Sequence, residues 1–194
     1  MSETESQLET LLRKGERLKE NILHARTIFA GKIFQVLQLE VQCPNKSVAV
    51  REIVRHSGGA GILAVKNHKI CLVRQYRVAL ARPTLEIPAG KLEAGEDPAA
   101  CAARELKEET GLIAQEFELV AVSYGSPGFT DEKTHIFAAR GLTQGNAQPD
   151  ADEFLDVVWI DLDEALWAIK AEKIVDSKTI IAIYEAVRRG ENCS

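Results

Sequence analysis

The chain has 194 residues, of which 45% are hydrophobic and 27% are charged, and its formal net charge is −5. This length and composition predict a globular protein with one sizeable domain and room for a small N-terminal addition. The acidic charge argues against nucleic acid as a partner, because a polyanionic backbone is normally held by a surplus of Lys and Arg. A site for a small phosphate compound would need local compensation from a metal ion or a few basic side chains.

The cysteines are few and scattered. They stand at positions 43, 71, 101 and 193 and form no CxxC motif, so we expect reduced thiols and a cytoplasmic location. The N-terminal residues are polar, and no apolar run in the sequence approaches the roughly 20 residues needed to span a bilayer. We therefore expect neither a secretory leader nor a membrane partner.

The first part of the chain changes from a helical to a strand pattern. Apolar residues between positions 3 and 25 recur at roughly helical spacing. From residue 27 to residue 55 the content is that of strands, with regular alternation of apolar and polar residues over 37–42 and a turn signal at 44–46. We predict one or two short helices followed by a region of antiparallel strands.

The central part begins with a hairpin. Two apolar segments, Gly61–Val65 and Ile70–Val73, flank a polar turn, which is typical of buried strands. Another apolar strand, Leu85–Ala89, leads to a segment of good helix formers from Ala99 to Glu109. Later strands and helices are predicted at 117–124, 134–139, 154–160, 161–170 and 174–189.

This order of elements indicates the fold class and the domains. Strands mixed with a few helices, without strict alternation, favour an α+β or α/β sandwich. We divide the chain into an N-terminal helix and strand region, residues 1–56, and a main domain, residues 57–194.

The helix predicted at 99–109 has well-defined ends and an unusual concentration of acid. Asp97 fits an N-cap, Pro98 the first helical position and Gly111 the residue that ends the helix. Glu105 and Glu109 are four residues apart and therefore share one face, and Glu108 lies beside Glu105. Like charges at these spacings, close to the C-terminal end of the helix dipole, destabilise the helix by a few tenths of a kcal/mol per pair.

Two interpretations of these acids remain open from the helix alone. The carboxylates can form a solvated charged face, which is the commoner role of short charge runs. They can also bind a hard divalent cation such as Mg²⁺, which prefers oxygen ligands. The preceding loop favours the second interpretation, because Gly90 and Gly95 allow tight turns and close approach of a ligand between the strand and the helix.

Residues 90–112 resemble the Nudix box, a motif of glycines, an arginine and glutamates at fixed spacing. Every defined position of the motif is matched, by Gly90, Glu96, Arg104, Glu105, Leu106, Glu108, Glu109, Gly111 and Leu112. Nine positions at fixed spacing are far more specific than a short glycine pattern. The resemblance implies a Nudix-type α/β/α sandwich with a mixed β-sheet, and hydrolysis of nucleoside diphosphates linked to another group with Mg²⁺, or Mn²⁺ as a substitute.

The same resemblance implies roles for single residues. Glu105 and Glu109 would be metal ligands, Glu108 would share a metal ion or position a catalytic water, and the carbonyl oxygen of Ala89 would be a further ligand. Arg104 would serve the catalytic machinery by orienting the acidic side chains through charge-assisted hydrogen bonds. Glu96, in the loop, is expected to hold the loop against the helix.

A loop after the box points to a branch of the family. The run Ser126–Glu132 places Pro127 where the ADP-ribose pyrophosphatase branch typically has a proline. Glu132 then resembles the carboxylate that serves that branch as general base or extra metal ligand, with Asp131 as the competing residue. Gly128, in the same loop, is a candidate for substrate contact. An ordinary Gly/Pro loop with solvated acids is the alternative.

Basic residues upstream complete the predicted site. Arg77 is a candidate for the substrate's phosphates, because a guanidinium can bind them through two parallel hydrogen bonds. Glu86 is open between contact with the substrate and a structural role. Arg51, Glu52 and Arg55 are candidates for a substrate wall, although solvated charges on an edge strand would look the same.

The branch also implies a homodimer in which the N-terminal strands take part, consistent with the frequency of two-fold dimers in general. The expected activity is Mg²⁺-dependent cleavage of a small nucleoside diphosphate sugar, ADP-ribose, to AMP and ribose 5-phosphate. Alternatives are hydrolysis of another nucleotide sugar such as GDP-mannose, or of a dinucleotide. A Nudix-fold module that senses nucleotides without cleaving them would be expected to lack box glutamates, which are all present here.

Overall fold

The computed structural model describes residues 6–148 and 153–190. Contacts divide the chain into two compact units, each of which is described by itself. The first unit contains residues 1–56 and 126–131, and the second contains residues 57–125 and 132–194. The loop 126–131 thus groups with the N-terminal strands, although it lies far from them in the sequence.

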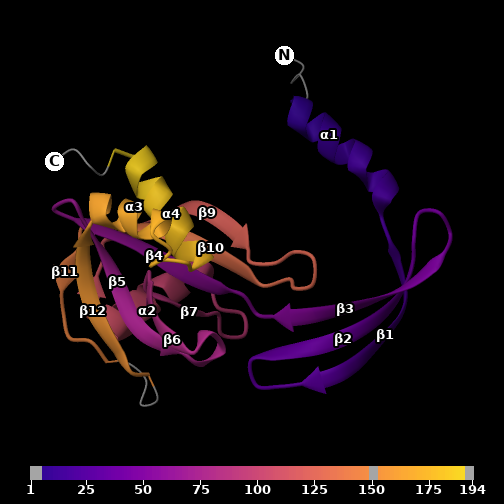
Figure 1. Ribbon diagram of the computed structural model, residues 1–194, viewed down its shortest axis with the longest axis horizontal. Helices are drawn as coiled ribbons and strands as arrows, with labels where there is room; N and C mark the ends of the chain where they lie inside the picture. Colours follow the sequence, from indigo (N-terminus) through magenta and orange to yellow (C-terminus); the bar gives the residue numbers. More distant parts are fainter. Residues whose placement is uncertain (1–5, 149–152, 191–194) are drawn as a thin grey trace. The chain divides into compact units, whose positions relative to one another are not determined.

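The N-terminal unit is a single antiparallel sheet preceded by a helix (Figure 1). Its elements are α1 (Gln7–Gly15), the 3-10 turn η1 (Glu16–Leu18), β1 (Asn21–Ala30), β2 (Phe34–Gln42) and β3 (Val48–His56). In α1, Ser6 and Glu9 form a reciprocal capping box. The strand order is β1-β2-β3, and Val54 of β3 binds the loop 126–131 through its N–H, which donates to the Phe129 carbonyl at 2.7 Å.

The helical pattern predicted over residues 3–25 is wrong beyond residue 18. Ile22, which fitted the helical spacing, lies in β1, where it pairs with Val41 of β2. Pairing with a neighbouring strand satisfies the backbone and overrides a weak local pattern.

The C-terminal unit is built on a mixed sheet. Its central strands are ordered β12-β5-β4-β10-β9, and β6 and β7 pair with β5 and β4. Strands β4 and β10 are parallel, whereas the other pairs are antiparallel. The strands are β4 (Gly59–Lys66), β5 (Lys69–Arg77), β6 (Arg82–Glu86), β7 (Ala89–Lys91), β8 (Leu112–Ile113), β9 (Glu116–Tyr124), β10 (Lys133–Arg140), β11 (Thr143–Gln144) and β12 (Leu155–Asp161). A short 3-10 turn, η2 (Val78–Leu80), separates β5 from β6, and β8 pairs with β11.

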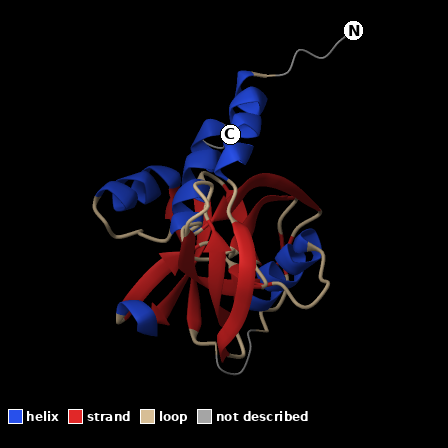
Figure 2. Cartoon of the chain, turned by 90° about the vertical axis from the view of Figure 1, so that its right-hand side faces the viewer, coloured by secondary structure: helices blue, strands red, loops and turns tan. Residues whose placement is uncertain are grey.

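Helices cover both faces of this sheet, which makes an α/β/α sandwich (Figure 2). Alternate residues of β10 point to opposite faces, so that Ile136 packs with α3 (Leu162–Lys170) and α4 (Ser177–Arg188), whereas Phe137 packs with α2 (Pro98–Thr110). Two buried apolar clusters result, one on each face. The fold class predicted from the sequence is confirmed.

The ends of α2 are those predicted. Asp97 accepts hydrogen bonds from the N–H groups of Ala99 and Ala100, Pro98 occupies the first turn, and Gly111 ends the helix at φ 71°. The inward side of α2 buries Cys101, Ala102 and Leu106 against the sheet. This packing fixes the rotation of the helix and therefore the direction in which its glutamates point. No helix within the described ranges has the length and apolar content required to cross a membrane.

Candidate active site

Strand β7 brings its backbone into contact with the acidic helix α2. Ala89 and Gly90 pair with Gly61 and Ala60 of β4. A side chain on residue 90 would overlap the carboxylate of Glu105, which lies directly against the Gly90 backbone. Glycine is therefore required at position 90 for Glu105 to occupy this place.

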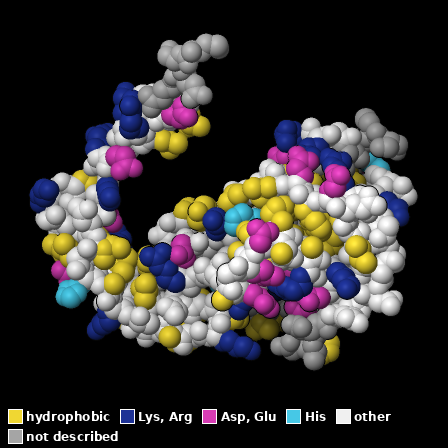
Figure 3. Space-filling model, turned by 180° about the vertical axis from the view of Figure 1, so that it is seen from behind, with side chains coloured by type: hydrophobic (Ala, Val, Ile, Leu, Met, Phe, Trp, Pro, Cys, Tyr) yellow, Lys and Arg dark blue, Asp and Glu magenta, His cyan; other side chains and the backbone are white. Residues whose placement is uncertain are grey.

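Arg104 gathers three carboxylates of the box. Its Nε lies 2.9 Å from Glu96 Oε1, and its Nη1 lies 2.6 Å from Glu105 Oε1 and 3.0 Å from Glu108 Oε2. The hydrogen bonds that Arg104 donates to Glu96, followed by those to Glu105 and Glu108, raise the pKa of Arg104 even though its burial opposes the charge. On the face of the C-terminal unit seen in Figure 3, acidic side chains lie next to basic ones.

Glu96 joins the loop to the helix. Besides binding Arg104, its Oε2 accepts a hydrogen bond from the N–H of Glu93 at 2.9 Å. The bond to Arg104, supported by this backbone bond, lowers the pKa of Glu96 to about 2. Glu96 therefore stays ionised and has the structural position expected from the sequence.

Glu109 differs from the other box acids. It is 3% exposed, and its Oε2 accepts a hydrogen bond from the Ala89 N–H at 3.0 Å. Burial raises its pKa to about 8, and the charges of Glu105 and Glu153 add to the effect, although the Ala89 N–H and the charge of Lys178 oppose it. Burial also raises the pKa of Glu105. When burial raises the pKa of a carboxyl group in this way, a nearby cation stabilises its charged form.

The donor set of this site suits a hard divalent ion. Glu105, Glu108, Glu109 and the carbonyl of Ala89 offer oxygen atoms only, as Mg²⁺ and Mn²⁺ prefer. Within residues 6–148 and 153–190, no three acidic, histidine or cysteine side chains already converge as a ligand cluster. Arg104 forms ion pairs with two of these acids, Glu105 and Glu108.

The predicted phosphate ligand Arg77 lies at the end of β5 beside a buried acid. Its Nε and Nη2 each lie 2.8 Å from an oxygen of Glu86. The side chain of Arg77 is 43% exposed, whereas that of Glu86 is 4% exposed. Burial disfavours the charged form of Glu86, but hydrogen bonds and charge from Arg77 and Lys178 overcome it and lower its pKa to about 2.

The two loop carboxylates have different surroundings. Asp131 Oδ2 lies 2.7 Å from Arg55 Nη1, and its Oδ1 accepts from the His56 N–H at 3.0 Å. Burial opposes its charge, but these bonds lower the pKa of Asp131, which thus anchors the loop to β3. Glu132 belongs to the C-terminal unit and is exposed.

The other candidates for substrate contact belong to the N-terminal unit. Arg51 lies on β3 with its guanidinium bound to Glu20, at 3.1 Å for Nε and 2.5 Å for Nη2. Glu52 on β3 and Gly128 in the loop are exposed. The structure thus gathers the box residues in one unit, and Arg51, Glu52, Arg55 and Gly128 in the other.

One carboxylate near the box was missed from the sequence. Glu153, an exposed residue just before β12, is among the charges that raise the pKa values of Glu105 and Glu109. Its side chain must therefore lie close enough for its charge to be felt by both. The available signal was the acidic run of Asp150, Asp152 and Glu153, but nothing in the sequence brings this run next to α2.

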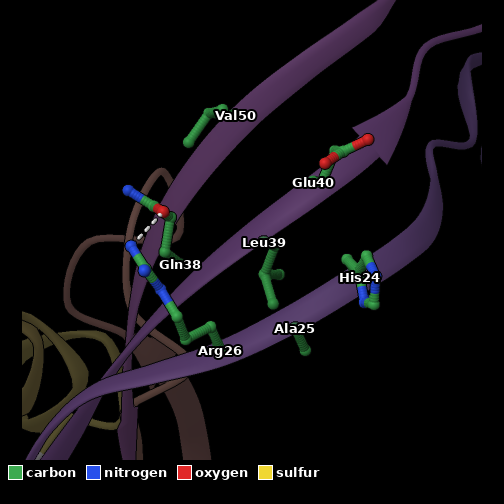
Figure 4. Close-up of a pocket in the computed structure, with 7 residues that line it drawn as sticks. All are labelled: His24, Ala25, Arg26, Gln38, Leu39, Glu40 and Val50. Atoms are coloured by element: carbon green, nitrogen blue, oxygen red, sulfur yellow. Dashed lines mark hydrogen bonds between the residues drawn. The ribbon is translucent and has the colours of Figure 1, made fainter.

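A hollow in the N-terminal sheet contains none of the predicted site residues. It is lined by His24, Ala25, Arg26, Gln38, Leu39, Glu40 and Val50 (Figure 4). Arg26 Nη2 donates to Gln38 Oε1 at 2.9 Å across it.

A glycine turn followed by a helix that carries Arg104 and three glutamates defines the class of protein. Residues 55–181 match the NUDIX domain, and the chain belongs to this family. The family predicted from residues 90–112 is thus confirmed.

Comparison with individual proteins gives more detail than the family match. The chain is 44% identical over 172 residues to a methanol dehydrogenase activator of Bacillus methanolicus, covering 87% of this chain and 93% of that protein. It is 41% identical over 169 residues to an ADP-ribose pyrophosphatase of Bacillus subtilis (strain 168), covering 86% and 91%. It is 33% identical over 144 residues to a GDP-mannose pyrophosphatase of Citrobacter koseri, covering 69% and 75%. A solved structure described as an ADP compounds hydrolase shares the fold, with a TM-score of 0.79, 21% identity and coverage of 90% and 95%.

Proposed function

We propose that this protein hydrolyses ADP-ribose to AMP and ribose 5-phosphate with Mg²⁺, for which Mn²⁺ can substitute. The observation that carries the proposal is Glu109, a buried carboxyl of high pKa at the Ala89 turn, next to the carboxylates that Arg104 gathers. The likeness to the ADP-ribose pyrophosphatase of Bacillus subtilis supports the choice of substrate.

The metal would be held by Glu105, Glu108, Glu109 and the Ala89 carbonyl. When bound, it supplies neutralisation of charge on the phosphoryl oxygens and activation of the attacking water. Arg104 restricts the rotamers of Glu105 and Glu108 through its hydrogen bonds, and the Ala89 N–H restricts Glu109. The protein's contribution to the reaction is thus mainly positioning and electrostatics.

The substrate's phosphates would be bound by Arg77, whose guanidinium is half exposed and oriented by Glu86. Arg51, Glu52, Arg55 and Gly128 are proposed to contribute the remaining wall. For the general base we propose Glu132, the exposed loop carboxylate that the resemblance to the ADP-ribose pyrophosphatase branch indicates. Asp131, the other loop acid, binds Arg55 and the His56 N–H. Glu153 is the competitor for this role, because its charge acts on the box glutamates.

We further propose a homodimer that works in the cytoplasm. In the N-terminal unit, β1 is exposed along its whole length and carries large apolar side chains, among them Ile22, Ile28 and Phe29. Apolar surface of this kind supports an interface between copies, and Figure 3 shows such side chains at the surface of this unit. Cys43, Cys71 and Cys101 are free thiols, which supports a reducing compartment. Light scattering on a sizing column tests the dimer, and a monomer at micromolar concentration would contradict it.

A second candidate is the hydrolysis of another nucleotide sugar, which the likeness to a GDP-mannose pyrophosphatase supports. A panel of ADP-ribose, GDP-mannose, ADP-glucose, NADH and 8-oxo-dGTP, assayed with Mg²⁺ and with EDTA, separates the candidates. We expect ADP-ribose to have the highest kcat/KM and EDTA to stop the reaction. Preference for GDP-mannose would replace the substrate while keeping the metal mechanism, and cleavage of no compound would overturn the proposed activity.

A further inference from the structure

The C-terminal unit contains a partly buried ionic cluster that reaches from the sheet to the last helix. We name it the Glu86 cluster, and it consists of Arg77, Thr84, Glu86, Asp176, Lys178 and Thr179. Arg77 and Glu86 were considered from the sequence, whereas the members from α4 were not. Among them Lys178 is a cation, and the activity proposed above gives it no role.

Lys178 completes the set of donors around Glu86. Its Nζ lies 2.5 Å from Glu86 Oε2, the oxygen that also accepts from Arg77 Nη2 at 2.8 Å. Thr84 Oγ1 lies 2.8 Å from Glu86 Oε1, which also accepts from Arg77 Nε. Both Glu86 oxygens therefore have two donors each, and a carboxylate bonded in this way has a fixed orientation.

The first turn of α4 holds Lys178 in place. Asp176, the N-cap of the helix, binds Lys178 Nζ at 3.0 Å and the Thr179 N–H at 3.0 Å. The side chain of Lys178 is only 17% exposed. Its ammonium group is thus confined between two carboxylates, which makes it part of a network and not a solvated surface charge.

The next residue, Thr179, connects the first turn of α4 to the segment that leads to Ala89, a proposed metal ligand. Thr179 Oγ1 accepts a hydrogen bond from the Ile87 N–H at 2.9 Å, and Thr179 is fully buried. Ile87 is two residues before Ala89, whose N–H binds Glu109. Consecutive residues of α4 therefore support different parts of the site: Lys178 supports Arg77 through Glu86, and Thr179 supports the turn at Ala89.

We propose that Lys178 is a positioning residue, which orients Arg77 for the substrate's phosphates by holding Glu86 in its present rotamer. This inference rests on the proposed function, because it uses Arg77 as the phosphate ligand. The role follows from charge balance. Glu86 binds two cations, so removing Lys178 leaves Arg77 as its one charged partner, with Thr84 as a neutral donor. Without Lys178, the Glu86 side chain is less firmly fixed. The Arg77 guanidinium, which remains bound to Glu86, then loses its orientation toward the substrate.

The test is a double-mutant cycle on Lys178 and Arg77, measured as kcat and KM for ADP-ribose with saturating Mg²⁺. Lys178→Met should raise KM by about tenfold or more and change kcat less, because uniform substrate binding is lost. Lys178→Arg should restore most of the affinity, because a cation of suitable length is present again. Lys173→Met is the matched control, since it removes an exposed lysine from the segment before α4 and should leave KM unchanged.

The cycle identifies the route of the effect. In an Arg77→Met background, Lys178→Met should change KM by less than about twofold, because residues that act through one another are not additive. An equal loss in both backgrounds, or an unchanged KM in folded Lys178→Met, would overturn the inference. A lower melting temperature with unchanged kinetics would do the same, because it would show a structural role only. If Lys178→Met does not fold, Lys178→Gln takes its place in the cycle.

The two proposals fail in different ways. If the wild-type protein cleaves no substrate of the panel, the proposed function fails, and the cycle is then run on the binding of inorganic pyrophosphate by calorimetry. Weaker pyrophosphate binding by Lys178→Met, seen only when Arg77 is present, would still support the positioning role. Pyrophosphate binding that is the same in wild type and Lys178→Met would overturn it.

Discussion

Two buried glutamates of the C-terminal unit, Glu86 and Glu109, are equally inaccessible, each 3% exposed, yet they differ in charge. Glu86 is bound by Arg77 and Lys178, which lower its pKa to about 2 against the effect of burial. Glu109 is bound by a backbone N–H, and burial raises its pKa to about 8. At neutral pH the first is therefore an ion and the second carries a proton.

The difference between Glu86 and Glu109 shows how the partners of a buried acid determine its charge and the role it can serve. A buried carboxylate with cation partners is satisfied and serves to hold other groups in place. A buried carboxyl without such compensation remains able to take up a cation, and its position on the acidic helix beside Ala89 makes a divalent metal the natural one. Glu86 therefore has the contacts of a structural residue, whereas Glu109 is the proposed metal ligand. The predictions below test this contrast.

The largest effect is expected from Glu109→Gln, which keeps the shape but removes a charged metal ligand. Turnover of ADP-ribose with Mg²⁺ should fall by about a thousandfold, since metal stabilisation of the transition state contributes several kcal/mol. Steady-state assays over a range of Mg²⁺ check this. The control is Glu116→Gln, the same change at an exposed position of β9, which should leave turnover unchanged. Turnover of Glu109→Gln within tenfold of wild type would contradict the metal assignment.

The same substitution at the two sites should have unequal effects on the free energy of unfolding. Glu86→Gln leaves two neighbouring cations without their carboxylate and should cost about 3 kcal/mol in the free energy of unfolding. Glu109→Gln should cost little in metal-free protein at pH 7, where the carboxyl is already neutral. Urea unfolding with EDTA measures both. Equal destabilisation by both variants would show that the two glutamates are not electrostatically different.

A smaller kinetic effect should identify the general base. Replacing the base with Gln should lower kcat by about a hundredfold with little change in KM, and we expect this for Glu132→Gln. Glu153→Gln is made beside it, because the charge of Glu153 acts on Glu105 and Glu109. If only Glu153→Gln loses turnover, the base has been assigned to the wrong loop.

The smallest effect is on the pH dependence of stability. The pKa of Glu86 is lowered to about 2 from its ordinary value of 4.5, so the stability that it contributes is present above pH 4.5 and is lost as the pH falls toward 2. Glu109, with its raised pKa, acts in the opposite sense, and its contribution is lost as the pH rises through about 8. Unfolding of metal-free protein should therefore show a shallower acid loss in Glu86→Gln, and a gain for Glu109→Gln that develops as the pH rises from about 4.5 to about 8. Parallel pH profiles for wild type and both variants would contradict the assigned pKa shifts.

Local sequence signals predicted the parts of this protein that depend on local chemistry. Asp97, Pro98 and Gly111 define the ends of α2 by capping preferences that act within a few residues. The fixed spacing of the box then predicted which glutamates share the helix face. The hairpin of β4 and β5 and the later strands were likewise recognisable from apolar runs.

The remaining features depend on contacts between distant segments. Lys178 is one of several charged residues in the last helices, and only the packing of α4 on the sheet brings it to Glu86. Glu153 is brought near α2 by the fold, and Asp131 is joined to Arg55 across the loop and β3. Ile22 fitted a helical spacing until pairing with β2 made it part of a strand. A single sequence carries no signal for such pairings.

The contrast between the two glutamates is tested most directly by calorimetric titration of the protein with Mg²⁺ at pH 7 in two buffers of different ionisation enthalpy. Because the pKa of Glu109 is about 8 in the absence of metal, binding should release about one proton per protein molecule. Glu86→Gln should release the same proton, whereas Glu109→Gln should not. Metal binding without proton release in the wild-type protein, or unchanged release in Glu109→Gln, would contradict the proposal that Glu109 is protonated in the metal-free protein and loses its proton when it binds the metal.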